Sequence, residues 1–370
     1  MKLAALAKPL AALAVAAALI SVILLALGAS PISVFAALYD GAFGNWVMFT
    51  DTLTKSTPLL FCGLAIAVAF EGALWNIGAN GQLLAGAMSA GALGPRLGGW
   101  PHAFAIPAVL IAGAGGGALW GGIAGWLRAR RDVNEVIATI MLNFVAAQIL
   151  SWLVHGPLME ASRAYPISAP IAPSAELRFY FRPSRLNLGM LLAVALALVC
   201  YVLLYQTEKG FELRAMGRNR HVSAFFGIDT HALTVWVMAL SGALAGLGGA
   251  THLAAITHRL YETLSPGWGY EAIAVALIAR LNPLAIVPSS VLFGALDNGA
   301  QAMQRTQGVS PVLVQVIEGL VIMILLAFDA TAWTTLRNAL WTPAPAVSED
   351  QRDDSTRPAD ESSASVTHSR

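Results

Sequence analysis

Residues 103–126 read AFAIPAVLIAGAGGGALWGGIAGW, a stretch without a single charged side chain. A bilayer has a hydrocarbon core about 30 Å thick, and a helix needs roughly 20 apolar residues to cross it. This stretch therefore predicts a membrane-spanning helix. Its glycines Gly113, Gly117, Gly121 and Gly125 recur every fourth residue. That spacing predicts a smooth ridge along one helix face, where a neighbouring backbone can approach closely.

The composition of the whole chain agrees with this stretch. The 370 residues are 57% hydrophobic and 12% charged, and the mean hydropathy is +0.66. Soluble domains carry about 25% charged residues, so a soluble enzyme and a disordered scaffold are excluded. The apolar segments also lack the alternation typical of a membrane β-barrel. A net charge of +1 predicts no surface for nucleic acid. We expect an all-α, polytopic transmembrane bundle.

About ten stretches are apolar enough to be membrane spans. They are Leu10–Gly28, 57–72, 80–94, 103–126, 134–155, 187–206, 232–252, 269–281, 284–303 and 310–329. The first could be a signal peptide, but its apolar run exceeds the usual h-region, which favours an uncleaved helix. Residues 1–341 are expected to form the transmembrane domain. Residues 342–370, rich in Ser, Pro, Asp and Glu, predict a disordered tail.

Lys and Arg residues in the short loops predict the orientation of the spans. With the N-terminus inside, eleven basic residues fall on the inner side and eight on the outer side. The cluster Arg128–Arg131 and the loop 207–231 account for most of this bias. An even number of spans returns the tail to the same side, so both termini are expected to be cytoplasmic.

Polar side chains gather between two apolar runs at Phe70–Gln82, which contains a carboxylate, three amides and three glycines. This segment is either a cytoplasmic loop or a broken helix that lines a solute path, since glycine permits kinks and amides can satisfy freed backbone groups. Polar groups at membrane depth usually face the bundle interior or a wet cavity. We expect five residues to line the path, although hydrogen bonding between helices is an equal alternative for each: Asn76, Asn80, Gln82, Asn143 and Glu271.

Several kinds of chemistry have no motif in the chain. It contains no G-x-x-x-x-G-K-[ST], H-E-x-x-H or G-x-S-x-G, so no ATPase, zinc-protease or serine-hydrolase activity is expected. We predict no catalytic residue, no metal site and no cofactor of its own. Cys62 and Cys200 lie in apolar runs and are expected to be free thiols. His252 and His258 have no carboxylate arranged around them and are interpreted as loop residues.

One segment before the tail, residues 206–229, is densely charged and also contains apolar side chains. This mixture suits short helices that dock on a soluble partner, and a solvated loop is the alternative. Gly217 is expected to let the chain turn between two such helices.

Three motifs resemble a known family: Leu74–Gln82 (LWNIGANGQ), Asn134–Asn143 (NEVIATIMLN) and Gly210–Ile228, with further similarity over Ala272–Pro283. Together they resemble permease subunits of ATP-binding cassette importers, in the branch of ribose, branched-chain amino acid and nucleoside permeases. The resemblance spans roughly residues 57–330 and points most closely to the nucleoside type, with simple-sugar permeases second.

The resemblance implies a permease domain in a bacterial inner membrane that forms the path for a small polar solute. It also implies two ATP-binding subunits that hydrolyse ATP, a second permease subunit and an extracytoplasmic solute-binding lipoprotein. Residues 207–231 would contact the ATPase, through Glu212, Arg214, Gly217, Arg218, Asn219 and Gly227. A stand-alone secondary transporter or channel would need an ion-coupling cluster, and an intramembrane enzyme would need a nucleophile or metal pair. The sequence displays neither.

Overall fold

The computed structural model describes residues 15, 17–25, 30–179, 184–308, 316, 319–320 and 323. In these residues every regular element is a helix, and β pairing is limited to isolated bridges such as Ile167 with Tyr261. The elements in chain order are α2 (Pro31–Phe43), α3 (Trp46–Glu71), α4 (Ala79–Leu93), η1 (Gly94–Leu97), α5 (His102–Arg131), α6 (Glu135–His155), η2 (Pro173–Ala175), α7 (Leu188–Gln206), α8 (Glu208–Arg218), α9 (Arg220–Phe225), α10 (Thr230–His252), η3 (Leu253–Thr257), α11 (Trp268–Ile278) and α12 (Pro283–Gln307). The predicted all-α class is confirmed.

Five described helices are long and apolar enough to cross a membrane: α3, α5, α6, α7 and α10 extended by η3. By contrast, α4 has 15 residues and α11 has 11. At 1.5 Å per residue they reach only about 22 Å and 16 Å, less than a bilayer core. The predicted spans 80–94 and 269–281 are therefore short helices that depend on neighbouring segments to complete a crossing.

The predicted span 57–72 begins too late, because α3 starts at Trp46. Its first half is rich in Thr, Ser and charged residues, which lowered the local hydropathy and hid the helix. Those hydroxyls find hydrogen-bond partners within the protein. Ser56 Oγ donates to Thr52 O of the same helix at 2.7 Å, and Thr52 Oγ1 donates to Ala42 O of α2 at 2.9 Å. The helix α2 was not predicted at all. The predicted span 310–329 and the tail 342–370 lie almost wholly outside the described residues.

Side-chain caps fix where many of the helices begin. Asn45 Oδ1 accepts from Met48 N at the start of α3, and Asn187 Oδ1 accepts from Gly189 N at the start of α7. Asn134, Asn219, Asp229 and Asn282 cap α6, α9, α10 and α12 in the same way. Each cap satisfies backbone N–H groups that have no partner within the helix. Polar residues in an apolar chain thus mark the helix boundaries.

The glycine ridge of α5 is a close-packing face, as predicted, and the helix that packs on it is α10. A Cβ on Gly117 would lie 2.7 Å from Gly246 Cα, and one on Gly121 would lie 3.1 Å from Gly242 Cα. No real side chain fits at such distances, so the two backbones meet directly. In lipid this close packing replaces the hydrophobic drive that holds soluble helices together. In the most apolar stretch of each helix, 78% of the residues of α3 and 61% of those of α10 are buried, against 22% for α5. α3 and α10 therefore form the centre of the bundle.

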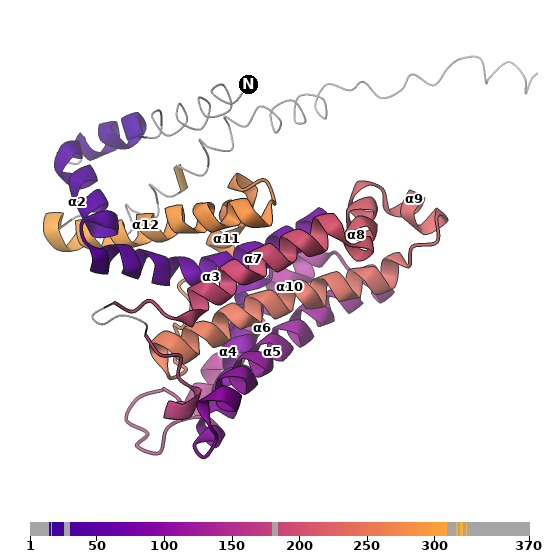
Figure 1. Cartoon of the computed structure of the whole chain (residues 1–370), viewed down its shortest axis with the longest axis horizontal. Coiled ribbons are helices and arrows are strands. Elements are labelled where there is room, and N and C mark those ends of the chain that lie inside the picture. Colours follow the sequence, from indigo (N-terminus) through magenta and orange to yellow (C-terminus); the bar gives the residue numbers. More distant parts are fainter. Residues whose placement is uncertain are drawn as a thin grey trace, which may run out of the picture. The chain divides into compact units, whose positions relative to one another are not determined.

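The helices have two distinct ends (Figure 1). At one end lie α8, α9 and the turn between α5 and α6, where His231 Nδ1 is 2.6 Å from Ala129 O. At the other end, residues 156–179 and 258–267 run alongside each other, with Ser168 N donating to Leu260 O at 2.9 Å. These ends are called the α8 end and the loop end below. The predicted inner groups 128–131 and 207–231 share the α8 end.

Candidate translocation site

The chain between α3 and α4 is partly buried in the bundle, with buried and exposed residues in alternation. α3 ends at Glu71, Ala73 takes a left-handed backbone conformation with φ 53°, and residues 74–78 then run without helical structure until α4 begins. Asn76 and Gly78 of this segment are buried, and a Cβ on Gly78 would lie 2.9 Å from Thr139 Cβ of α6. Of the two interpretations of Phe70–Gln82, the structure therefore supports the broken helix.

Asn76 and Gln82 bind each other. Asn76 Nδ2 donates to Gln82 Oε1 at 2.9 Å, and Gln82 Nε2 donates back to Asn76 Oδ1 at 3.1 Å. Asn76 Nδ2 also donates to Ser241 Oγ of α10 at 2.7 Å, and this hydroxyl donates to Ala65 O of α3 at 2.6 Å. The exposed fractions of the two amide side chains are 0% and 2%. These contacts tie the broken segment to α3, α4 and α10.

Asn143 adds a third amide from the middle of α6. Its Oδ1 accepts from Gly81 N at 2.7 Å, while its Nδ2 donates to Ile77 O at 2.9 Å and to the Tyr270 hydroxyl at 3.1 Å. It thereby satisfies backbone groups that the break between α3 and α4 leaves free. We call Asn76, Gln82, Asn143, Ser241 and Tyr270 the amide cluster.

Asn80 and Glu271 lie where α4 and α11 begin. Asn80 Oδ1 accepts from Ser265 Oγ at 2.7 Å, and a Cβ on Gly269 would lie 2.6 Å from Asn80 Cβ, so the two helix starts are in contact. Both Asn80 and Glu271 are half-buried. The structure thus gathers the predicted residues at the starts of two short helices, although Asn76 and Gln82 have no exposed surface there. Sequence analysis missed Ser241, Ser265 and Tyr270, because each is more than 120 residues from its partner.

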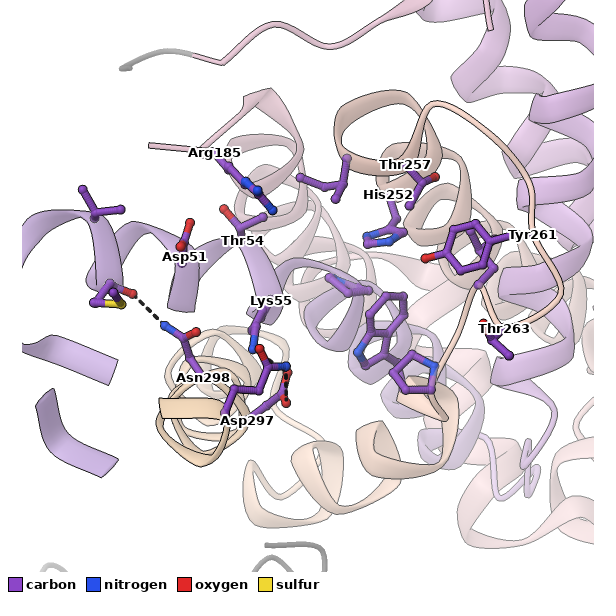
Figure 2. A pocket seen from close by; sticks show the side chains of 18 of the residues that line it. Asp51, Thr54, Lys55, Arg185, His252, Thr257, Tyr261, Thr263, Asp297 and Asn298 are labelled. Carbon is purple, nitrogen blue, oxygen red and sulfur yellow. Dashed lines mark hydrogen bonds and ion pairs between the residues drawn. The ribbon is translucent and has the colours of Figure 1, made fainter. Parts of the chain in front are cut away.

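A cavity of about 910 Å³ opens between α3, η3, the 258–267 segment and α12. On one wall, Lys55 Nζ of α3 lies 3.3 Å from Asp297 Oδ2 of α12 (Figure 2). Gln301 Nε2, one turn further along α12, donates to Asp297 Oδ1 at 3.4 Å. The neighbouring Asn298 is buried and donates to Gly41 O at 2.9 Å, which ties α12 to α2. We call this space the α3–α12 cavity.

The opposite wall of the α3–α12 cavity is aromatic. Figure 2 shows His252, Thr257 and Tyr261 across the cavity from Lys55 and Asp297. The ring centroids of His252 and Trp268 are 4.6 Å apart in an edge-to-face arrangement. The interpretation of His252 as a loop residue was wrong, since it is the last residue of α10. Trp268 lines the cavity and opens α11, next to Gly269 and Tyr270, so the cavity and the amide cluster adjoin.

At the α8 end, residues 207–231 form two short helices, α8 and α9. Arg214 lies over the ring of Tyr205 at 5.2 Å from its centroid, and Tyr205 OH donates to Glu71 Oε1 at 3.3 Å. Glu212 pairs with Lys209 at 2.7 Å. These contacts join α8 to the last residue of α3, directly before the broken segment.

Gly217 is not the turn that sequence analysis expected. It lies within α8, and a Cβ there would lie 3.1 Å from the carbonyl carbon of Glu71. The chain turns instead at Asn219, directly after Arg218, and Asn219 Oδ1 accepts from Val222 N at 3.1 Å. The small residue is needed for close approach of α8 to α3, because only glycine leaves room for that backbone.

The outer side of α9 is apolar and solvent-facing. Phe225 and Phe226 are 86% and 76% exposed. A groove of about 610 Å³ runs beside Phe226 and Gly227, which has a positive φ of 86°. Asp229 opens α10, and hydrogen bonds from the backbone N–H groups of Ala232 and His231 hold the pKa of its carboxyl below the ordinary value.

In the part of the chain that the structure describes, His, Cys, Asp and Glu side chains form no group of three or more that could hold a metal ion. Cys62 and Cys200 are both buried free thiols. The charged, hydroxyl and amide groups that line the α3–α12 cavity can offer hydrogen bonds and charge to a solute, and its aromatic rings can offer contact surface.

Comparison with known proteins places the chain among transport proteins. Residues 48–326 match the family described as branched-chain amino acid transport system, permease component. The guanosine ABC transporter permease protein NupP of Bacillus subtilis is 35% identical over 87% of this chain and 93% of its own length. The nucleoside ABC transporter permease protein NupB of Lactococcus lactis is 31% identical over 85% and 88%.

A third relative is named for a sugar. The glucose ABC transporter permease protein TsgB13 of Haloferax volcanii is 32% identical over 86% of both chains. A comparison with solved structures found no match. The predicted resemblance is confirmed by these relatives and by the apolar helices, which also make this a membrane protein. The chain belongs to the branched-chain amino acid transport system permease component family, as a membrane permease subunit of an ABC transporter.

Proposed function

We propose that this chain forms the membrane path of an importer for nucleosides, powered by ATP hydrolysis in partner subunits. The observation that supports it most is the joint placement of polar residues from α4, α6 and α11 inside an apolar bundle, next to an open polar cavity. Amides, hydroxyls and aromatic rings suit a neutral solute with hydroxyls and a heterocycle. The 35% identity to a permease named for guanosine supports the same class.

The path itself is proposed to run past Asn80, Asn143 and Glu271, where α4 meets α11. Asn76 and Gln82, whose amides bind each other, would shape this path by holding the broken segment in place. No cofactor of the chain's own is proposed, and ATP would bind to the partners.

The α8 end is proposed to face the cytoplasm and to dock on an ATP-binding subunit. The exposed Phe225 and Phe226 offer an apolar contact, and Glu212, Arg214, Arg218, Asn219 and Gly227 surround it. The contact of Gly217 with the end of α3 would pass motion to the broken segment, since packed elements with discrete arrangements transmit motion. Two ATP-binding subunits, a second permease subunit and an extracytoplasmic solute-binding lipoprotein would complete the importer.

The proposed location is a bacterial inner membrane, with both termini in the cytoplasm and the loop end outside. Cysteine labelling in intact cells tests this orientation. An impermeant thiol reagent should label Ala164→Cys and should leave Arg130→Cys unlabelled, since both positions are exposed at opposite ends. Labelling of Arg130→Cys alone would reverse the orientation.

Uptake measurements separate the nucleoside from the sugar alternative, which the 32% identity to a glucose permease supports. Radiolabelled guanosine and glucose are supplied to cells that express the complete transport system or lack only this chain. The proposal expects chain-dependent uptake of guanosine that unlabelled glucose does not compete. Chain-dependent uptake of glucose, with none of guanosine, would contradict the nucleoside proposal and support a sugar importer.

A further inference from the structure

The Lys55–Asp297 pair lies at an unusual place for an ion pair. It joins α3 to α12 on the wall of the α3–α12 cavity, and α3 is one of the helices long and apolar enough to cross a membrane. Charged side chains in such helices are costly and commonly mark functional sites. The exposed fractions of the two side chains are 24% for Lys55 and 39% for Asp297. The carboxylate is thus the partner that faces the open space, and the ammonium lies behind it.

Within the described residues, Lys55 Nζ is buried and has no hydrogen bond of good geometry, although it lies 3.3 Å from the carboxylate. Lys55 is thus the counter-charge of Asp297 on the cavity wall. An ionised carboxylate is purely an acceptor and can bind two adjacent donors at once.

The surroundings indicate which donors these are. The charged side chains that line the cavity are Asp51, Asp297, Lys55, Arg185 and Arg305, nearly balanced in sign, which suits a neutral solute. Thr257 Oγ1 on the opposite wall is also buried without a partner among the described residues. Beside it, Tyr261 and the His252–Trp268 pair offer ring surfaces. A cavity of about 910 Å³ is in the upper part of the usual range for small-molecule sites.

We propose that the α3–α12 cavity is a binding site for the nucleoside, in which Asp297 accepts hydrogen bonds from the two adjacent ribose hydroxyls. Gln301 donates a hydrogen bond to the carboxylate, Lys55 pairs with it, and the aromatic wall contacts the base. This inference rests on the proposed function and adds a specific site to it. The site lies on the loop-end side of the amide cluster, so it would receive the solute before the path between α4 and α11 opens.

The test compares guanosine with 2′,3′-dideoxyguanosine, which lacks both hydroxyls. Uptake of each is measured in cells with the complete transport system carrying the wild type, Asp297→Asn, or Asp40→Asn as a control at an exposed carboxylate of α2. Hydrogen bonds to a charged group justify an expected loss of about tenfold or more in guanosine uptake for Asp297→Asn. Uptake of the dideoxy compound should be unchanged. The variants share every other component of the transport system. A change between variants in the ratio of guanosine uptake to dideoxyguanosine uptake therefore reports on the permease.

A second variant separates recognition from a purely structural tie. Lys55→Met/Asp297→Leu replaces the pair with apolar side chains of similar volume, which commonly preserves stability. The proposal expects normal amounts of assembled protein and loss of guanosine uptake. Restored guanosine uptake in this double variant, or an equal loss of both solutes in Asp297→Asn, would overturn the inference. If the wild type imports neither solute, the proposed function itself fails.

Discussion

The amide cluster and the α3–α12 cavity are two polar regions within one apolar bundle, and they differ in how their polar atoms are satisfied. In the amide cluster, Asn76, Gln82 and Asn143 are at most 2% exposed, and each makes two or more hydrogen bonds within the protein. In the cavity, Asp297 is 39% exposed, and Lys55 Nζ and Thr257 Oγ1 have no hydrogen-bond partner among the described residues.

This difference separates two roles that look the same in a sequence. Polar groups that satisfy one another stabilise an irregular backbone in a medium that offers no water. Polar groups that face an open space remain able to bind something else. We therefore assign the mutual hydrogen bonds of the amide cluster to positioning of the broken segment, beside which the proposed path runs, and the cavity to binding of the solute.

The largest effect is expected for Asn143→Leu. This change leaves Gly81 N, Ile77 O and the Tyr270 hydroxyl without the amide partner they now have. Unsatisfied buried groups cost about 1–3 kcal/mol each, so the free energy of unfolding should fall by several kcal/mol. The yield of monodisperse protein in detergent and its melting temperature measure this loss.

Phe144→Leu is the matched control for that substitution, because Phe144 is the next residue of α6 and is 60% exposed. It should leave the melting temperature nearly unchanged. Asp297→Asn provides the comparison from the cavity. We expect it to lower the free energy of unfolding by less than about 1 kcal/mol, because the ion pair that it breaks is partly exposed. A melting temperature for Asn143→Leu equal to that of Phe144→Leu would remove the distinction between the two regions.

A smaller effect is expected for Gly217→Val, which tests whether the α8 end is joined to the broken segment. The added side chain would press on the backbone of Glu71 and Gly72. Overpacking costs about 1–3 kcal/mol, so α8 should shift rather than the bundle unfold. Uptake and solute-stimulated ATP hydrolysis should both fall in the assembled complex. Gly122→Ala, where the nearest atom is 3.8 Å away, serves as control. Normal values of both activities in Gly217→Val would contradict the proposed coupling.

The smallest effect concerns the loop end. Hydrogen bonds from Ser162 and Arg259 hold the pKa of Glu160 below its ordinary value of 4.5. A carboxyl with a lowered pKa stabilises the fold above its unfolded pKa, and this contribution is lost as the pH falls through the folded pKa. Glu160→Gln should thus lower the melting temperature slightly at pH 7, and the difference from wild type should shrink below about pH 4.5. A difference independent of pH would show that the charge of Glu160 plays no part.

Much of the fold follows from local sequence. Runs such as 103–126 and 187–206 exceed the length a bilayer needs, and the four-residue spacing of Gly113 to Gly125 identified a real packing face. The start of α3 was missed because its hydroxyls bond within the helix and to α2, which hydropathy does not register. The same limit hid α2, a helix of 13 residues.

Only part of the candidate site could be predicted from the sequence. The density of amides in residues 76–82 predicted a special segment, and Asn143, predicted to line the same path, binds Gly81 N and Ile77 O of it. That these residues line a solute path stays a prediction. What the amides do depends on Ser241 and Tyr270, which only the tertiary fold brings near. The cavity was not predicted, because Lys55, Asp297 and His252 lie far apart in sequence and only the tertiary fold brings them to one space.

The most direct test of the account is solute protection of a cysteine in the cavity. Thr54→Cys places a thiol on the lining of the α3–α12 cavity, while the native Cys62 and Cys200 are buried and the parent protein shows any background. The account predicts that an impermeant thiol reagent labels this cysteine and that guanosine slows the labelling in a saturable way, whereas glucose does not. Labelling at the same rate with and without guanosine would contradict the claim that the cavity binds the solute.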